Sequence, residues 1–305
     1  MKLIYLFYFL VFPGFLFTSI VGLLLTWIDR KVTARIHWRV GPPWYQPFAD
    51  FLKLLSKETL IPSGAHKVIF LLAPILSILA MTVIAVMLFL MNFFPEKSFI
   101  GDLIVLLYLF ALPPLGLIIG GSASKNPLSA VGASREMTLY FGYELPFLAA
   151  ILITVIKTNG LIQIGEIINF QHVNGPIFYS ISGIIAMIIS LFVIQAKLGY
   201  VPFDIAEAEQ EIMAGPILEY SGLALALFRL SKAMMFFLLP CFLVTIYWGG
   251  LTHWTAILKV LLLVVIIILI KNTNPRLRID QALKFFWLIL LPFAIIGIIL
   301  AFNNL

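Results

Sequence analysis

The sequence is poor in charged residues. Only 11% of its 305 residues are Asp, Glu, Lys or Arg, whereas 62% are hydrophobic and the mean hydropathy is +1.08. A soluble domain carries about 25% charged residues, so this chain has too few to cover its apolar side chains in water. The composition predicts an integral membrane protein.

Cysteine is almost absent. The single residue, Cys241, excludes an internal disulfide and any metal or iron–sulfur site built from several thiolates. We therefore expect no metal site and no redox cofactor in this chain. The sequence also lacks strand-like alternation, Gly/Ser linkers and clear internal repeats. A single membrane domain over residues 1–305 is the prediction.

Long apolar runs, by contrast, are abundant. A bilayer span needs about 20 predominantly apolar residues. The sequence predicts an all-α integral membrane fold with about eight transmembrane helices, at 3–28, 69–93, 100–121, 138–157, 177–197, 216–247, 255–271 and 283–302. The first run is longer than the apolar part of a signal peptide and lacks an A-x-A cleavage site, so we expect it to be a retained span.

Lys and Arg are unevenly divided between the two predicted sides. With eight spans, both termini share one side, which carries four of these residues, whereas the other side carries fourteen. Cytoplasmic connections hold the excess of basic residues in membrane proteins. We expect both termini outside and the first, third, fifth and seventh connections in the cytoplasm. The net charge of +6 then reflects topology and does not indicate nucleic-acid binding.

The first connection ends in a short amphipathic segment, residues 46–58. Its apolar side chains recur at helical spacing, at Phe48, Phe51, Leu52 and Leu55. This pattern predicts a cytoplasmic-side helix that lies in the headgroup plane or docks on a partner. The preceding Gly41-Pro42-Pro43 predicts a stiff turn.

Three charged residues fall inside predicted spans. Glu144 lies near one third of the way along the fourth, and Arg229 and Lys232 share a helix face in the middle of the sixth. A charge at bilayer depth costs at least about 2.5–3.5 kcal/mol, so such residues tend to face protein or a water-filled cavity. A functional role is favoured over structural ion pairing.

The fifth connection concentrates acidic residues. It holds five of the fourteen in the chain: Asp204, Glu207, Glu209, Glu211 and Glu219. If the segment is helical, the first, second and fourth of these form one stripe. Repulsion and burial are expected to raise some of their pKa values. With the three charges inside the spans, they form a candidate proton or charge path; a solvated acidic loop is the alternative.

Charged residues of two other connections are candidates to pair with these carboxylates or with one another. They are Lys125 and Arg135 in the third connection, and Arg276, Arg278 and Asp280 in the seventh. The alternative for the basic residues is that they only enforce topology.

Four motifs cover all four predicted cytoplasmic connections: DRKVTARIHWRVGPPWYQPFADFLKLLSKE, SREMTLYFGYELP, VPFDIAEAEQEIMAGPILEYSG and NPRLRIDQALKFFW. Together they resemble the first-subunit (H-subunit) family of respiratory complex I. That family includes the membrane subunits of energy-converting NiFe hydrogenases, formate hydrogenlyase and membrane-bound sulfur-reducing complexes. The resemblance extends over nearly the whole chain.

The resemblance implies a membrane platform, without a redox centre of its own, in an oxidoreductase complex. The acidic connection and Glu144 would link redox chemistry to H⁺ or Na⁺ translocation. The segment facing the redox arm would include Arg30, Arg35, Arg39, Gly41, Pro42, Asp50 and Lys53. Expected partners are hydrogenase-like large and small subunits, an iron–sulfur subunit and antiporter-like membrane subunits, in the cell membrane of a prokaryote. The NiFe centre and iron–sulfur clusters would lie in those partners.

Departures from the family pattern point to one branch. Quinone-reducing members usually have Glu-Arg-Lys at Asp29-Arg30-Lys31, a Gly-Glu-Ser-Glu core in the acidic connection, and an acid near Lys232. The differences favour the hydrogenase type over the alternative, a quinone-site subunit of an NADH or ferredoxin:quinone oxidoreductase. A stand-alone secondary transporter is less favoured, because its polar site should lie near the midplane.

Overall fold

The computed structural model describes residues 2–303, apart from the side chains of Lys2, Leu3 and Glu209. This part of the chain is helical and contains no strand. The helices in chain order are α1 (Lys2–Leu10), α2 (Phe15–Ile36), α3 (Gln46–Leu55), α4 (Lys67–Phe93), η1 (Pro95–Lys97), α5 (Asp102–Ala123), α6 (Pro127–Lys157), α7 (Ile164–Asn174), η2 (Ile177–Tyr179), α8 (Ile181–Lys197), α9 (Glu209–Ile212), η3 (Gly215–Ile217), α10 (Gly222–Tyr247), α11 (Thr255–Thr273), α12 (Ile279–Lys284), η4 (Phe285–Leu290) and α13 (Leu291–Phe302).

Among the described residues, seven helical stretches are long and apolar enough to cross a membrane. They are Ile4–Ile36, Lys67–Phe93, Asp102–Ala123, Pro127–Lys157, Gly222–Tyr247, Thr255–Thr273 and Ile279–Phe302. The remaining predicted span is α8, whose 17 residues are at the short end of the about 17–25 that cross a bilayer. The all-α membrane fold is confirmed.

The helix of the fourth span is longer than the predicted span. Helix α6 begins at Pro127 rather than at residue 138. Proline suits the first helical position, and the Asn126 side chain caps the helix by accepting the Leu128 N–H at 2.9 Å. The Gly- and Ser-rich segment is therefore mostly helical. Arg135 lies on α6 and not in a connection.

Other predicted bounds differ as well. Helix α10 begins at Gly222 rather than at residue 216, because η3 forms a separate turn before it. Helix α2 continues past residue 28 to Ile36, and the amphipathic helix α3 ends at Leu55 rather than at residue 58. Arg229 and Lys232 consequently lie in the first half of α10.

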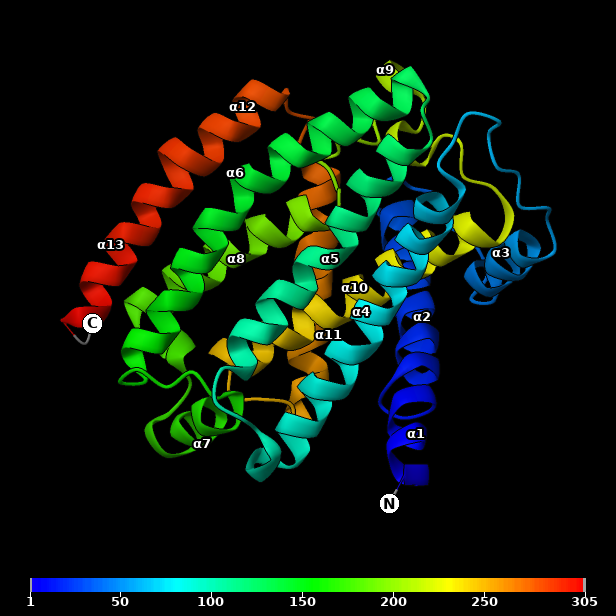
Figure 1. The fold of residues 1–305 in the computed structure, drawn as a ribbon. Coiled ribbons are helices and arrows are strands. Elements are labelled where there is room, and N and C mark those ends of the chain that lie inside the picture. Colours follow the sequence, from blue (N-terminus) through cyan, green and yellow to red (C-terminus); the bar gives the residue numbers. More distant parts are fainter. Residues whose placement is uncertain (1, 304–305) are drawn as a thin grey trace.

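Helix α10 forms the centre of the bundle (Figure 1). It is almost wholly buried, and it contacts α2, α4 and α11. Helix α4 pairs with α5, and α6 packs against α8 and α13. A Cβ at Gly116 would lie 2.3 Å from Ser77 Oγ, so this small residue permits the close approach of α4 and α5.

The bundle has two ends, which we name by what they carry. The loop face carries residues 37–66, 124–126, 198–221 and 274–278, together with α3 and α9 (Figure 1). The terminal face carries residues 94–101, 158–180 and 248–254, on the same side as α1 and the end of α13. The loop face thus gathers the first, third, fifth and seventh connections.

Candidate functional site

The fifth connection is folded into the protein instead of forming a helix on its surface. Helix is confined to α9 (Glu209–Ile212) and η3 (Gly215–Ile217), so the condition for a helical stripe of acids is not met. Phe203 is buried against the rings of Phe285 and Phe286, at centroid distances of 5.7 and 4.8 Å. The Leu277 N–H donates to Pro202 O at 3.0 Å. Inward packing of this kind overrides the helical spacing of the acids.

The second half of the connection is held by Gly215. Its φ is +53°, and a Cβ there would lie 1.9 Å from Ala206 O, so only glycine fits. Ser129 on α6 donates to Gly215 O at 3.1 Å. A Cβ at Gly132 would lie 2.7 Å from Gly215 Cα, which shows how closely the connection sits on α6.

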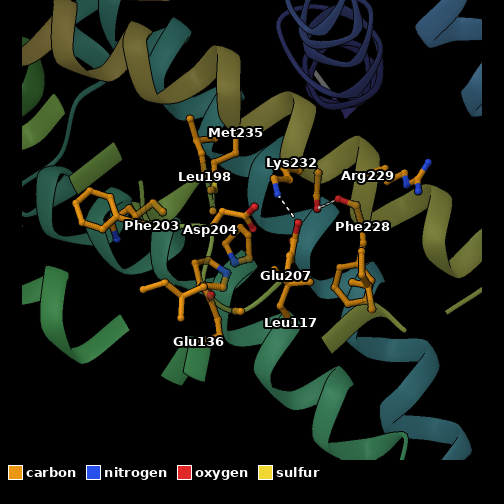
Figure 2. Close-up of a pocket in the computed structure, with 18 residues that line it drawn as sticks. Leu117, Glu136, Leu198, Phe203, Asp204, Glu207, Phe228, Arg229, Lys232 and Met235 are labelled. Carbon is orange, nitrogen blue, oxygen red and sulfur yellow. Dashed lines mark hydrogen bonds and ion pairs between the residues drawn. The ribbon is translucent and has the colours of Figure 1, made fainter. Parts of the chain in front are cut away.

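A cavity of about 240 Å³, which we call the chamber, lies between the fifth connection and helices α5, α6, α8 and α10 (Figure 2). Pro113, Phe203, Phe228 and Met235 contribute to its apolar wall. Its charged lining residues are Glu136, Lys197, Asp204, Glu207, Arg229 and Lys232. The fold therefore gathers charges from four separate segments around one small volume.

Ion pairs join the fifth connection to the surrounding helices. Lys232 Nζ on α10 donates to Glu207 Oε2 at 2.8 Å. Arg276 Nη2 donates to Asp204 Oδ2 at 2.7 Å. Burial raises the pKa of the Asp204 carboxyl, and the neighbouring Arg276 offsets only part of this effect. The raised pKa of Asp204 has the direction that the sequence predicts for some acids of the fifth connection.

A further ion pair lies deeper in the bundle. Lys197 Nζ on α8 donates to Glu144 Oε2 on α6 at 2.6 Å, with 0% and 17% of the two side chains exposed. The ammonium also lies over the rings of Tyr143 and Phe147, at 5.1 and 5.0 Å from their centroids. Glu144 is past the middle of α6, not one third of the way along a span. Such a pair is costly to desolvate, so its presence favours a functional role.

The remaining acids of the fifth connection lie near the outer edge of this connection, which we call its rim. Glu211 accepts from Arg135 Nη1 at 2.7 Å, with 65% and 28% of the side chains exposed. Glu219 accepts a short hydrogen bond from Asn126 Nδ2. The side chain of Glu209 lies outside the described part of the structure.

The structure brings only some of the candidate pairing residues together. Arg135 and Arg276 contact carboxylates of the fifth connection. Lys125, Arg278 and Asp280 form no ion pair with any described side chain. Arg278 and Asp280 instead line a surface cavity of about 320 Å³ beside the connection.

A second cavity, of about 350 Å³, lies between α2, α3 and α10. Arg229 lines both cavities, and its guanidinium points away from the labelled acids of the chamber (Figure 2). Arg30 Nη1 donates to Asp50 Oδ2 at 2.7 Å across the second cavity. This hydrogen bond lowers the pKa of the Asp50 carboxyl. The pair ties α3 to α2.

Basic and aromatic side chains next to α2 and α3 are exposed on the loop face. Arg35, Arg39 and Lys53 are all exposed, and Trp38 is 97% exposed. Gly41 and Pro42 form the half-buried turn behind them, and Pro42 O accepts the Trp27 indole N–H at 3.1 Å. The proposed arm-facing segment is therefore a free surface in this chain.

Sequence reasoning missed several charged residues of the site. Glu136 and Lys197 both line the chamber, and neither is among the candidate residues predicted from the sequence. Lys271 Nζ donates to Asp29 Oδ2 at 2.7 Å, although both residues had been assigned to span ends. Glu136 and Glu144 are eight residues apart, which places them on one helix face. This pattern could be recognised only if α6 was known to begin before residue 136.

Comparisons with known proteins agree along nearly the whole chain. A family model described as NADH dehydrogenase matches residues 9–302. The H subunit of the NADH-quinone oxidoreductase of Thermomicrobium roseum is 34% identical, over 93% of this chain and 92% of that protein. Its counterpart in Dehalococcoides mccartyi is 32% identical, over 96% and 84%. Among solved structures, a chain of the membrane-bound sulfane sulfur reductase, an archaeal respiratory membrane complex, has a TM-score of 0.83 at 30% identity, covering 93% of this chain and 96% of that one.

Proposed function

The chain belongs to the NADH dehydrogenase family, which contains the H subunits of complex I-like respiratory complexes, and from this premise we propose that it couples electron transfer to ion translocation. It is a multi-pass membrane component of such an assembly. In the proposal the loop face docks a hydrophilic redox arm. The chamber and the Glu144–Lys197 pair then relay charge toward antiporter-like membrane subunits.

The observation that carries the proposal is a series of cross-element ion pairs leading from the loop face into the bundle. Asp204–Arg276 lies at the loop face and Glu207–Lys232 at the chamber. Lys197, the third cation, lines the chamber and reaches Glu144 in α6. A shift of charge at any one pair changes the electrostatic energy of the next, because protein screens charges less than water does.

The loop face is the side that we assign to the cytoplasm. It carries most of the Lys and Arg residues, as cytoplasmic connections do. Both termini then face outward across a prokaryotic cell membrane. The exposed Arg35, Arg39 and Trp38 are suited to an interface, since arginine and aromatic residues are enriched there. Hydrogenase-like large and small subunits and an iron–sulfur subunit are the proposed partners.

We favour the hydrogenase type of complex because of Lys232. This residue stands near the position where quinone-reducing members tend to carry an acid, and here it pairs with Glu207. One similar chain belongs to a sulfane sulfur reductase, and two similar H subunits belong to NADH-quinone oxidoreductases, so the choice of branch is based on the residues of this chain. The NiFe centre and iron–sulfur clusters are assigned to partner subunits.

Purification of the affinity-tagged chain from its native membrane tests the function. The expected result is co-purification with iron–sulfur and antiporter-like proteins, in a complex that drives ion uptake into liposomes when its redox substrates are added. Cysteines that bind NiFe in the large partner subunit would identify the hydrogenase type. A chain that purifies alone and transports a solute by itself would contradict the proposal.

The second cavity favours one alternative function, a quinone site. Its wall combines apolar side chains such as Leu23, Phe51 and Leu54 with the polar Arg30–Asp50 pair. Ligand pockets commonly show this combination. An azido-quinone that labels α2, α3 or α10 in the intact complex, and is displaced by excess quinone, would favour this alternative. Redox activity without quinone and without such labelling would favour the hydrogenase type.

A further inference from the structure

Glu136 is the unpaired acid of the chamber. The residue is only 5% exposed, and its carboxyl group forms no hydrogen bond or ion pair with the described residues. The other acidic lining residues, Asp204 and Glu207, each have a basic partner within 2.8 Å. A buried carboxylate is costly to keep charged without a partner, so Glu136 requires either a proton or a cation.

One cation is available to it. Lys197 is committed to Glu144, and Arg276 to Asp204. Arg229 lines the chamber but points away from it (Figure 2). This leaves Lys232, which interacts electrostatically with both Glu136 and Glu207. Lysine is well suited to a change of partner, because its ammonium is a compact charge on a flexible stem.

Glu136 and Glu207 approach Lys232 from different elements. Glu207 belongs to the fifth connection and Glu136 to α6, and both line the same cavity as Lys232 (Figure 2). The chamber, at about 240 Å³, exceeds the roughly 10–15 Å³ that one water needs. Water can therefore link the two carboxyl groups across the space between them.

We propose that Lys232 exchanges partners between Glu207 and Glu136, and that one proton crosses the chamber in the opposite sense. In the first state Lys232 pairs with Glu207, as in the structure, and the proton is assigned to Glu136. When Lys232 moves to Glu136, the O–H bond at Glu136 breaks and one forms at Glu207 through chamber water. One carboxylate, one carboxylic acid and one ammonium are present in both states. The net charge of the chamber therefore stays constant.

This proposal rests on the proposed coupling function and adds Glu136 to it. Other charged groups facing the exchange are Asp204 from the fifth connection and Lys197 from α8. Tyr143, on the same helix as Glu136, has a buried hydroxyl without a hydrogen-bond partner among the described residues. The apolar wall of α5, which includes Pro113, Pro114 and Leu117, supplies no charge.

The test uses the intact complex in liposomes. Infrared difference spectra between two pH values should show a carboxylic-acid C=O band that is lost in Glu136→Gln and retained in the exposed terminal-face control Glu96→Gln. A band lost in Glu207→Gln should belong to the second acid, and Lys232→Met should abolish the exchange between the two. Ion translocation per electron should fall to background in Glu136→Gln, with electron transfer retained, and be partly restored in Glu136→Asp.

The outcomes separate this proposal from the coupling function. Wild-type ion translocation in Glu136→Gln, or no band assignable to Glu136, would overturn the exchange. A wild-type complex that transfers electrons without moving ions would remove the coupling function. The spectra alone would then decide the exchange: Glu136 and Glu207 bands that respond together to Lys232→Met support it, and independent bands overturn it.

Discussion

The two ends of the bundle satisfy their buried polar groups by different chemistry. Each of the six ion pairs among the described residues has at least one member in, or within three residues of, a loop-face connection, and we call this region the loop-face half. At the terminal face no ion pair is formed among the described residues, and the buried polar groups are joined by amide side chains and by Asp102, whose carboxyl accepts from Ile164 N–H at 2.8 Å. Asn92 donates to Thr245 Oγ1 at 3.1 Å and accepts from Leu251 N–H at 2.7 Å. Gln171 donates to two carbonyls at 3.0 Å and accepts from Gly249 N–H at 2.8 Å.

The difference separates structural from functional polarity. Neutral hydrogen bonds join helix ends without the desolvation penalty of an ion pair. A buried ion pair such as Lys197–Glu144 in the loop-face half is a costly way to achieve the same stability. Their retention there is explained if charge has to move or change partner in that half, as the coupling function requires.

Removing one member of the buried pair should have the largest effect on stability. Lys197→Met leaves Glu144 without its partner, and breaking a buried pair costs about 3–5 kcal/mol. Thermal unfolding of the detergent-solubilised complex should report the loss. The double variant Lys197→Met/Glu144→Gln should recover most of it, since no charge is left unpaired. A double variant as unstable as the single one would show that packing, and not charge, is responsible.

The terminal face should give a moderate effect of a different kind. Gln171→Leu removes three hydrogen bonds, each with a net contribution of about 0.5–1.5 kcal/mol. We expect a lower unfolding temperature with unchanged ion translocation per electron. His172→Ala, at the exposed neighbouring position, is the control and should be neutral. Uncoupling in Gln171→Leu would erase the distinction between the two ends.

The smallest stability effect should come from the rim of the acidic connection. Glu211 and Arg135 are 65% and 28% exposed, and solvent-exposed pairs contribute only about 0–1 kcal/mol. Glu211→Gln should therefore unfold within about 1 kcal/mol of the wild type in denaturant titration. A loss as large as that of Lys197→Met would mean that the rim, like the chamber, is sealed from solvent in the complex.

Much of this organisation could be predicted from the sequence, and the exceptions have physical reasons. Apolar runs located the spans, because bilayer thickness fixes their length, and the helical spacing of apolar residues located the amphipathic helix. The spacing of the acids did not predict the backbone path of the fifth connection, because the burial of Phe203 and the constraint at Gly215 determine that path. Glu136 was missed because a Gly- and Ser-rich segment proved to be helix. Partner choice, as for Lys197 and Glu144, depends on tertiary packing that one-dimensional periodicity does not encode.

The central claim is that the buried charges of the loop-face half couple electron transfer to ion movement. Glu144→Gln tests it most directly, because the substitution keeps the shape of the side chain and removes its negative charge. The measurement is the number of ions translocated per electron by the reconstituted complex. We predict that assembly and electron transfer persist while this ratio falls to the background of uncoupled liposomes. A wild-type ratio in the assembled variant would contradict the account.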